Sequence, residues 1–383
     1  MKKVIAAAAG LMLAGTLASA AVAAEAGVKF KGDARARYYL QNEYASSDSE
    51  DTHWNSRVRL QWTATSKGGA YAVGRFRLAD ATWNGTQSNR KGSDAGNLWV
   101  DKAYIGVPFG PITVEAGLTY RNLTDFAFAW RGADAVDFIY KGENTNVRAF
   151  IQVEDEYEED VVDADGNVVQ AANDADNDND IMMYGVRLDQ KFAGGWGLVA
   201  YAAYQDDQQF TDESGTLAGL KVSGAFGGIT TAAEVAYQES DLLGSDDDGI
   251  GAYIEATVPV GPASIYGIVG VAQDGFVVDD DFAGQGNVMG NFSQISSFAI
   301  GGSDFGDTTW VVVAPKFKAT ESLTLGANLG YYDGDVDSAF EIGLDASYAV
   351  TDGASLNAIF GYVDFDEADN NPLGFGLSLE ISY

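Results

Sequence analysis

The sequence predicts a single transmembrane antiparallel β-barrel, with 18 strands favoured over 16. Three observations lead to this fold class. The N-terminus is typical of an exported chain, and the chain has no cysteine that could stabilise an exported fold through disulfides. The remaining sequence alternates apolar and polar residues in segments of about ten residues, the length of a membrane-crossing strand. The connections between these segments alternate between short and long.

Residues 1–24 have the layout of a cleaved signal peptide. Two lysines precede an apolar run at 4–17, and small residues follow up to Ala24. A retained membrane anchor is the alternative, but the run is shorter than the ~20 residues that a spanning helix needs. We therefore expect residues 25–383 to form the mature chain and to fold as one pore domain.

The chain is strongly acidic. Its formal net charge is −33, from 23 basic and 56 acidic residues. This excess argues against nucleic-acid partners and favours solvated acidic surfaces or metal-rich surroundings. No apolar stretch after the signal reaches 18 residues, so spanning helices are excluded, whereas alternating barrel strands are not.

Period-two alternation gives eighteen predicted strands. They cover residues 28–41, 54–65, 70–82, 97–107, 112–120, 135–140, 147–154, 180–190, 196–204, 216–226, 229–240, 249–260, 263–273, 307–318, 323–332, 338–350, 354–364 and 372–383. The short connections are 66–69, 108–111, 141–146, 191–195, 227–228, 261–262, 319–322 and 351–353, and the long ones include 83–96, 155–179, 274–306 and 365–371. Short turns at one end and long loops at the other are typical of outer-membrane barrels, whose short turns face the periplasm.

The last predicted strand shows the alternation most clearly. Its odd-numbered residues from Leu373 to Tyr383 are apolar or aromatic, and its even-numbered residues from Gly374 to Glu380 are small or polar. We expect the first face to contact lipid and the second to face the lumen. A terminal aromatic residue in the lipid-facing phase resembles the end of bacterial outer-membrane proteins, although those more often end in Phe. Tyr383 is therefore the predicted assembly signal.

Six arginines lie in pairs on three consecutive predicted strands, and we call them the arginine ladder. They are Arg35, Arg37, Arg57, Arg59, Arg75 and Arg77. The members of each pair share a face because successive side chains of a strand alternate. Their distances from the predicted turns place all three pairs at about mid-barrel. Inside a barrel surrounded by lipid, such a charged face lines a water-filled lumen.

A row of solvated charges with carboxylates on neighbouring strands is the alternative interpretation of the ladder. The distribution of charge favours a functional wall, because ten of the 11 arginines precede residue 150. Like charges on neighbouring strands also cost at least a few tenths of a kcal/mol per pair. We leave Asp101 and Lys102 out of the ladder, because either phase of an ideal strand points one of them toward lipid.

The chain resembles the general bacterial porins over about residues 28–154. The resemblance rests on the order and spacing of four landmarks, the last of which leads to Gly117 and Tyr120. They are Val28-Lys29-Phe30-Lys31-Gly32, Arg57-Val58-Arg59-Leu60, Ala103-Tyr104-Ile105-Gly106-Val107 and Phe109-Gly110-Pro111-Ile112-Thr113-Val114. The resemblance implies a homotrimeric channel in the outer membrane, in contact with lipid and lipopolysaccharide. It also implies that the barrel-assembly machinery binds the C-terminal strand.

The resemblance further implies that residues 121–134 correspond to the loop that porins fold into the lumen. Asp125, Asp134 and Asp137 would form the acidic side of the resulting constriction. The arginine ladder would form its basic wall.

A second candidate site lies in the predicted external loop at 154–180, which holds twelve carboxylates and no basic residue. Asp163, Asp165 and Asn167 surround a glycine turn and resemble half of a calcium loop, without the bidentate glutamate of an EF-hand. A solvated acidic loop is the alternative. Loosely bound calcium is therefore the only cofactor that the sequence suggests.

Three functions remain open. The leading one is a channel for passive diffusion of small hydrophilic solutes and ions. The second is a substrate-specific channel for small anions or carboxylates, and the third is a calcium-dependent surface protein. We expect no enzymatic activity, because the only histidine, His53, lies in a predicted loop and no phosphate-binding glycine motif occurs.

Overall fold

The computed structural model describes most of the chain from residue 26 onward. The described residues are 26–42, 50–82, 98–129, 131–155, 161–162, 168–170, 181–207, 214–239, 248–279, 282–285, 300–301, 305–367 and 371–383. The predicted signal peptide at 1–24 and the candidate calcium ligands Asp163, Asp165 and Asn167 lie outside this set. Within it, no helix is long and apolar enough to cross a membrane.

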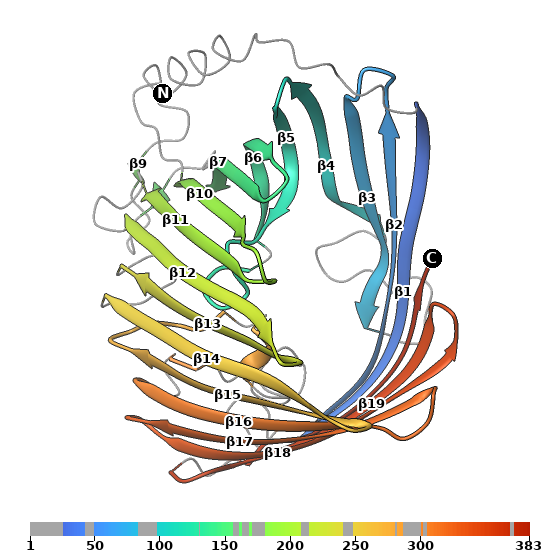
Figure 1. Cartoon of the computed structure of the whole chain (residues 1–383), viewed down its shortest axis with the longest axis vertical. Helices are drawn as coiled ribbons and strands as arrows, with labels where there is room; N and C mark the ends of the chain where they lie inside the picture. Colours follow the sequence, from blue (N-terminus) through green and yellow to red (C-terminus); the bar gives the residue numbers. More distant parts are fainter. Residues whose placement is uncertain are drawn as a thin grey trace.

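Eighteen strands form one closed antiparallel barrel (Figure 1). They are β1 (Gly27–Asn42), β2 (Glu50–Thr65), β3 (Tyr71–Thr82), β4 (Leu98–Phe109), β5 (Ile112–Arg121), β6 (Arg131–Lys141), β7 (Thr145–Asp155), β10 (Ile181–Lys191), β11 (Gly197–Asp207), β12 (Gly215–Phe226), β13 (Ile229–Gln238), β14 (Gly249–Val260), β15 (Ala263–Gln273), β16 (Thr308–Lys318), β17 (Leu323–Gly334), β18 (Ser338–Thr351), β19 (Ala354–Phe365) and β20 (Leu373–Ser382). Each predicted strand matches one of these, so the predicted count of eighteen is confirmed.

Every barrel strand pairs with its neighbours in chain order, apart from one small insertion. The short strands β8 (Val161–Val162) and β9 (Val168–Gln170) pair with each other in the connection between β7 and β10, and with no other strand among the described residues. The pairing of β1 with β20 closes the barrel, and the C-terminus lies beside β1 in Figure 1.

The last residue completes this closure. Tyr383 and Gly32 exchange both backbone hydrogen bonds, at 2.8 and 3.0 Å. The tyrosine ring covers Gly32 so closely that a Cβ there would lie 2.7 Å from the ring and 2.4 Å from the carbonyl oxygen of Arg59. Gly32 is thus a notch that receives the aromatic end of the chain.

The two faces of each strand differ in burial as the alternation predicts. On β16, Trp310 and Val312 are buried, whereas Val311 and Val313 are exposed. The exposed apolar residues recur around the barrel and form its lipid-facing side. Short turns close one end, such as Gly227-Gly228, where both residues have positive φ as a two-residue hairpin turn requires.

The buried core lies inside the barrel, and only the first of the two loops that contribute to it was predicted. In the part of the chain that the structure describes, two connections fold inward, and we name them the first inward loop (122–129) and the second inward loop (274–285, described except for 280 and 281). Their apolar side chains cluster with lumen-facing residues of strands from β7 to β19. The first loop is shorter than the predicted 121–134, because β6 begins at Arg131.

Candidate functional site

The arginine ladder lies on β1, β2 and β3, at matching heights on the lumen face. Arg35 is directly opposite Arg57, and Arg59 is directly opposite Arg77. The alternation of each strand places the ladder on the same face as buried Tyr39 and opposite lipid-facing residues such as Phe30. The predicted juxtaposition of the three pairs is therefore present in the structure.

Carboxylates on the same face bind the ladder, each from the strand next to the arginines that it binds. Asp33 forms ion pairs with Arg59 at 2.8 Å and Arg57 at 3.3 Å. Asp101 does the same with Arg75 at 2.7 Å and Arg77 at 2.5 Å. Two arginines thus share each carboxylate, and both clusters keep a net positive charge.

Asp101 and Lys102 both belong to this wall, contrary to our reading of the sequence. The pairing of β3 with β4 shifts so that Arg75 faces Lys102 while Phe76 faces Val100. Asp101 is the extra residue of a β-bulge, and a bulge lets two consecutive side chains point to the same side. Asp101 is consequently buried among the arginines instead of facing lipid.

The ring of Tyr120 on β5 extends the basic wall. The guanidinium of Arg75 and the ammonium of Lys102 lie 5.3 and 5.4 Å from the ring centroid, within the range of cation–π interactions. Arg77 also donates a hydrogen bond to the Tyr120 hydroxyl, at 3.2 Å. One aromatic side chain therefore holds three cations in place.

The three predicted acidic residues have different surroundings. Asp125 is exposed on the first inward loop and accepts a hydrogen bond from Asn122. Asp137 is fully buried on the lumen face of β6, where Arg121 binds it at 2.9 Å and Arg148 lies 3.6 Å away. Asp134 is exposed and alternates with the buried Ala133 and Ala135, so it lies on the outer face, away from the lumen. The structure therefore brings only Asp125 and Asp137 to the lumen.

Three cavities meet beside the ladder. One of about 730 Å³ and one of about 250 Å³ share Arg37, Glu380, Lys316 and Asp345. A third, of about 500 Å³, also includes Arg37 and Glu380 together with other ladder arginines. Arg37 and Glu380 form an ion pair with a distance of 3.9 Å. This pair is the point at which all three cavities join.

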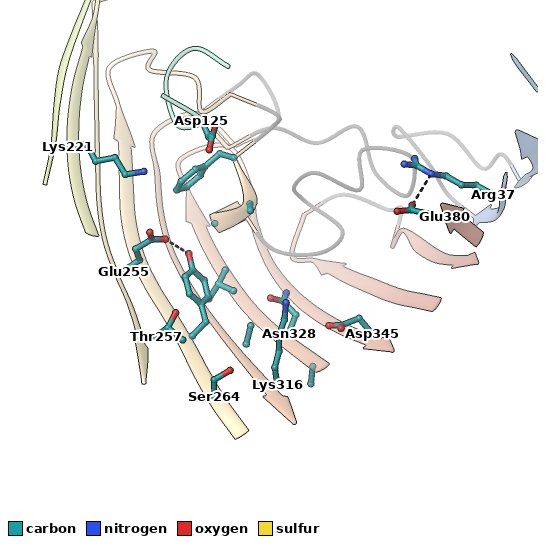
Figure 2. Close-up of a pocket in the computed structure, with 17 residues that line it drawn as sticks. Arg37, Asp125, Lys221, Glu255, Thr257, Ser264, Lys316, Asn328, Asp345 and Glu380 are labelled. Carbon is teal, nitrogen blue, oxygen red and sulfur yellow. Dashed lines mark hydrogen bonds and ion pairs between the residues drawn. The ribbon is translucent and has the colours of Figure 1, made fainter. Parts of the chain in front are cut away.

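The cavity of about 730 Å³ has charged side chains on opposite sides. Figure 2 shows the pair of Arg37 and Glu380 on one side and Lys221 and Glu255 on the other. Lys221 lies 3.8 Å from the buried Glu234, and Glu255 accepts a hydrogen bond from Tyr266 at 2.8 Å. The cavity is thus a polar passage with both signs of charge on its wall.

Several of these lumen residues were not predicted as part of the site. Lys316, Asp345 and Glu380 lie on the polar face of their strands, so the alternation could have identified them. Asp101 could not be assigned in this way, because no pattern in the sequence reveals the bulge. The second inward loop was not predicted either, because no sequence pattern in a long connection shows which part of it enters the lumen.

The comparisons with known proteins agree with this architecture. The family model of Gram-negative porins matches residues 6–282. The chain belongs to the Gram-negative porin family. This porin is an outer-membrane channel, and its family and fold are those of channels and not of enzymes. No curated protein matches the sequence.

Solved structures with the same fold include three channels named Occ. A double variant of OccD1 (OprD) has a TM-score of 0.66 at 11% identity, covering 95% of the porin and 97% of that chain. OccAB1 of Acinetobacter baumannii has a TM-score of 0.64 at 12% identity, covering 95% of the porin and 99% of that chain. OccD3 (OpdP) of Pseudomonas aeruginosa has a TM-score of 0.64 at 12% identity, covering 95% of the porin and 93% of that chain. At such identities the likeness concerns the fold alone.

Proposed function

We propose that the porin conducts small hydrophilic solutes and ions by passive diffusion, and that the arginine ladder forms the basic wall of its constriction. The observation that carries this proposal is the one-sided placement of the ladder beside three joined cavities. A charge in a narrow aqueous passage with low-dielectric walls is less screened than a charge in bulk water. The ladder would therefore influence which ions enter.

The opposing side of the constriction would consist of Asp125 and the lumen carboxylates near it. Asp137 contributes less to the field in the passage, because Arg121 binds it closely and both side chains are buried. The net acidity of the chain still favours cations at its mouths. We therefore expect a weak preference for cations in the native channel, reduced by the ladder.

Planar-bilayer recording tests this function directly. Purified porin added to a lipid bilayer should give discrete conductance steps in potassium chloride. The absence of steps from protein that migrates as a folded, heat-modifiable band would overturn the proposal. No catalytic residue is proposed, and any solute would cross without chemical change.

A substrate-specific channel for small carboxylates is the second candidate, and the geometry of two arginines favours it. Arg59 and Arg75 bind their wall carboxylates through Nε. Among the described residues, the terminal amino groups of these two side chains make no hydrogen bond. Such groups suit bidentate contact with a solute carboxylate. Current block by a small carboxylate at millimolar concentration, without block by a neutral solute of equal size, would distinguish this candidate from general diffusion.

The remaining assignments rest on the family resemblance and on sequence. We propose that the porin is a homotrimer in contact with lipopolysaccharide, that residues 1–24 are cleaved, and that the assembly machinery binds the strand ending at Tyr383. Crosslinking in native membranes tests the trimer, and N-terminal sequencing tests the cleavage. We also propose that any calcium at Asp163, Asp165 and Asn167 binds loosely. A surface-protein role would require calcium to alter cell adhesion.

A further inference from the structure

The first inward loop is a compact turn with internal hydrogen bonds. The amide of Leu123 donates to the carbonyl of Phe128 at 2.9 Å, and the amide of Phe128 donates to the carbonyl of Thr124 at 3.1 Å. Arg187 on β10 holds the base of the loop by donating to the carbonyls of Asn122 and Leu123, both at 2.9 Å. These contacts fix the position at which the loop leaves the wall. They do not fix the tip of the loop, which contacts other residues.

The second inward loop supports the tip through one residue, Asp279. Its amide donates to the carbonyl of Phe126 at 3.0 Å, and its carboxylate accepts from the amide of Ala129 at 2.9 Å. The two loops are 150 residues apart in sequence at this contact. Asp279 is only 5% exposed, so water competes weakly for these hydrogen bonds.

Aromatic packing joins the loops beside this contact. Phe126 stacks on Phe276 of the second loop with ring centroids 5.1 Å apart, and Phe282 contacts it edge-on at 5.1 Å. Phe276 in turn fills a hollow over Gly249 and Gly251 of β14, where a Cβ would lie 2.2 to 2.3 Å from its atoms. The second loop thus packs against the glycines of the wall, and the first loop packs against the second.

We propose that Asp279 is the positioning residue that locks the two inward loops together and thereby sets the width of the passage beside the arginine ladder. The inference rests on the proposed function in that it assumes a conducting lumen. The aromatic cluster stabilises the contact between the loops but does not fix the position of one loop relative to the other, because the hydrophobic effect is not directional. Hydrogen bonds are directional, and buried Asp279 donates one and accepts one. Together they fix the position of the tip of the first loop against the β14 side of the lumen.

The test compares two substitutions at this position by single-channel recording. Asp279→Ala removes the acceptor for the Ala129 amide, whereas Asp279→Asn keeps an oxygen that can accept it. We expect Asp279→Ala to raise conductance roughly twofold and to add open-channel noise, since a released loop leaves a wider passage whose width fluctuates. Asp279→Asn should keep the conductance within about a fifth of the native value, because the contact between the loops needs the hydrogen-bond acceptor and not the charge.

Asp364→Ala is the matched control, because it removes an exposed carboxylate at the external end of β19, outside both loops. It should leave conductance and noise unchanged. Equal conductance in the native and Asp279→Ala channels, with the heat-modifiable folded band intact, would overturn the lock. So would an increase of the same size in Asp279→Asn, which would assign the effect to charge. A native protein without channels would instead refute the proposed function.

If Asp279→Ala fails to fold, Phe126→Leu gives a second measurement. Leucine keeps an apolar side chain in the cluster, and it leaves available both the hydrogen bond from the Asp279 amide to the carbonyl of residue 126 and the one from the Ala129 amide to the Asp279 carboxylate. The lock predicts a conductance close to that of the native channel for this variant. A large increase in Phe126→Leu would show that ring packing, and not Asp279, positions the loop.

Discussion

Arg35 of β1 lies directly opposite Arg57 of β2 on the lumen face of the wall. On the other side of Arg35, the register places Glu380 of β20. Adjacent like charges normally destabilise a sheet. Asp33, two residues before Arg35 on the same face of β1, is bound by both Arg57 and Arg59 and offsets part of this cost. The wall is therefore a stable arrangement that still carries excess positive charge.

The first prediction concerns Asp101, the bulge residue that Arg75 and Arg77 share. Asp101→Asn removes a negative charge from the basic wall while retaining the size of the side chain. We expect the reversal potential in a salt gradient to shift toward anion selectivity, because both arginines keep their charge. Asp364→Asn, an exposed carboxylate near the end of β19 that lies outside all three cavities, should give no shift. A shift toward cations in the Asp101 variant would contradict the account.

The sequence predicted the strands well because a barrel wall obeys a local rule. Alternation along β16 or β20 reports directly which side chains meet lipid and which meet the lumen. The same rule placed Arg35, Arg57 and Arg77 on one face. It failed at Asp101, where a bulge interrupts the alternation. The resemblance to porins, and not the alternation, had assigned Asp134 to the acidic side of the lumen, but this residue lies on the outer face of β6.

The inward loops were harder to predict because their positions depend on contacts between distant segments. Asp279 meets Ala129 across 150 residues, and no local pattern marks either as a partner. The hollow over Gly251 is visible only when Phe276 is seen to fill it. The resemblance to porins indicated the first inward loop, whereas the second followed only from the structure.

The second prediction concerns closure of the barrel at Gly32. Gly32→Val would place its side chain against the Tyr383 ring and the Arg59 carbonyl, so the last strand could not pair fully. We expect a loss of roughly 1–3 kcal/mol in stability, typical of overpacking. Gly27→Val is the matched control, since no atom lies within 4 Å of its Cβ position. Equal temperatures of heat modification in the two variants would exclude a role for the notch.

The third prediction compares the two arginines that contact the buried Asp137. Arg121→Met leaves that carboxylate buried without its closest partner and should destabilise the fold by roughly 3–5 kcal/mol. Arg148→Met removes a more exposed partner at 3.6 Å and should cost at most about 1 kcal/mol. Denaturant unfolding in lipid vesicles measures both. The assignment fails if the Arg148 variant is the less stable one.

The fourth prediction concerns the acidic external loop. β7 and β10 pair directly, from Asp155 opposite Ile181 to Thr145 opposite Gln190, so the barrel wall is complete without the segment that joins them. Deletion of residues 158–178 should therefore preserve the heat-modifiable band. Loss of the folded band, or a large rise in the melting temperature of the intact protein on addition of calcium, would instead make the loop a structural metal site.

The most direct test of the central claim is the reversal potential of the Arg57→Ala/Arg59→Ala double variant in a potassium chloride gradient. If the ladder lines the constriction, removing two guanidinium groups should raise conductance and shift selectivity toward cations. Lys67→Ala/Lys141→Ala, which removes two charges at the short-turn end of the barrel, should leave both values near those of the native channel. An unchanged reversal potential and conductance in the arginine variant, with folding intact, would contradict the account.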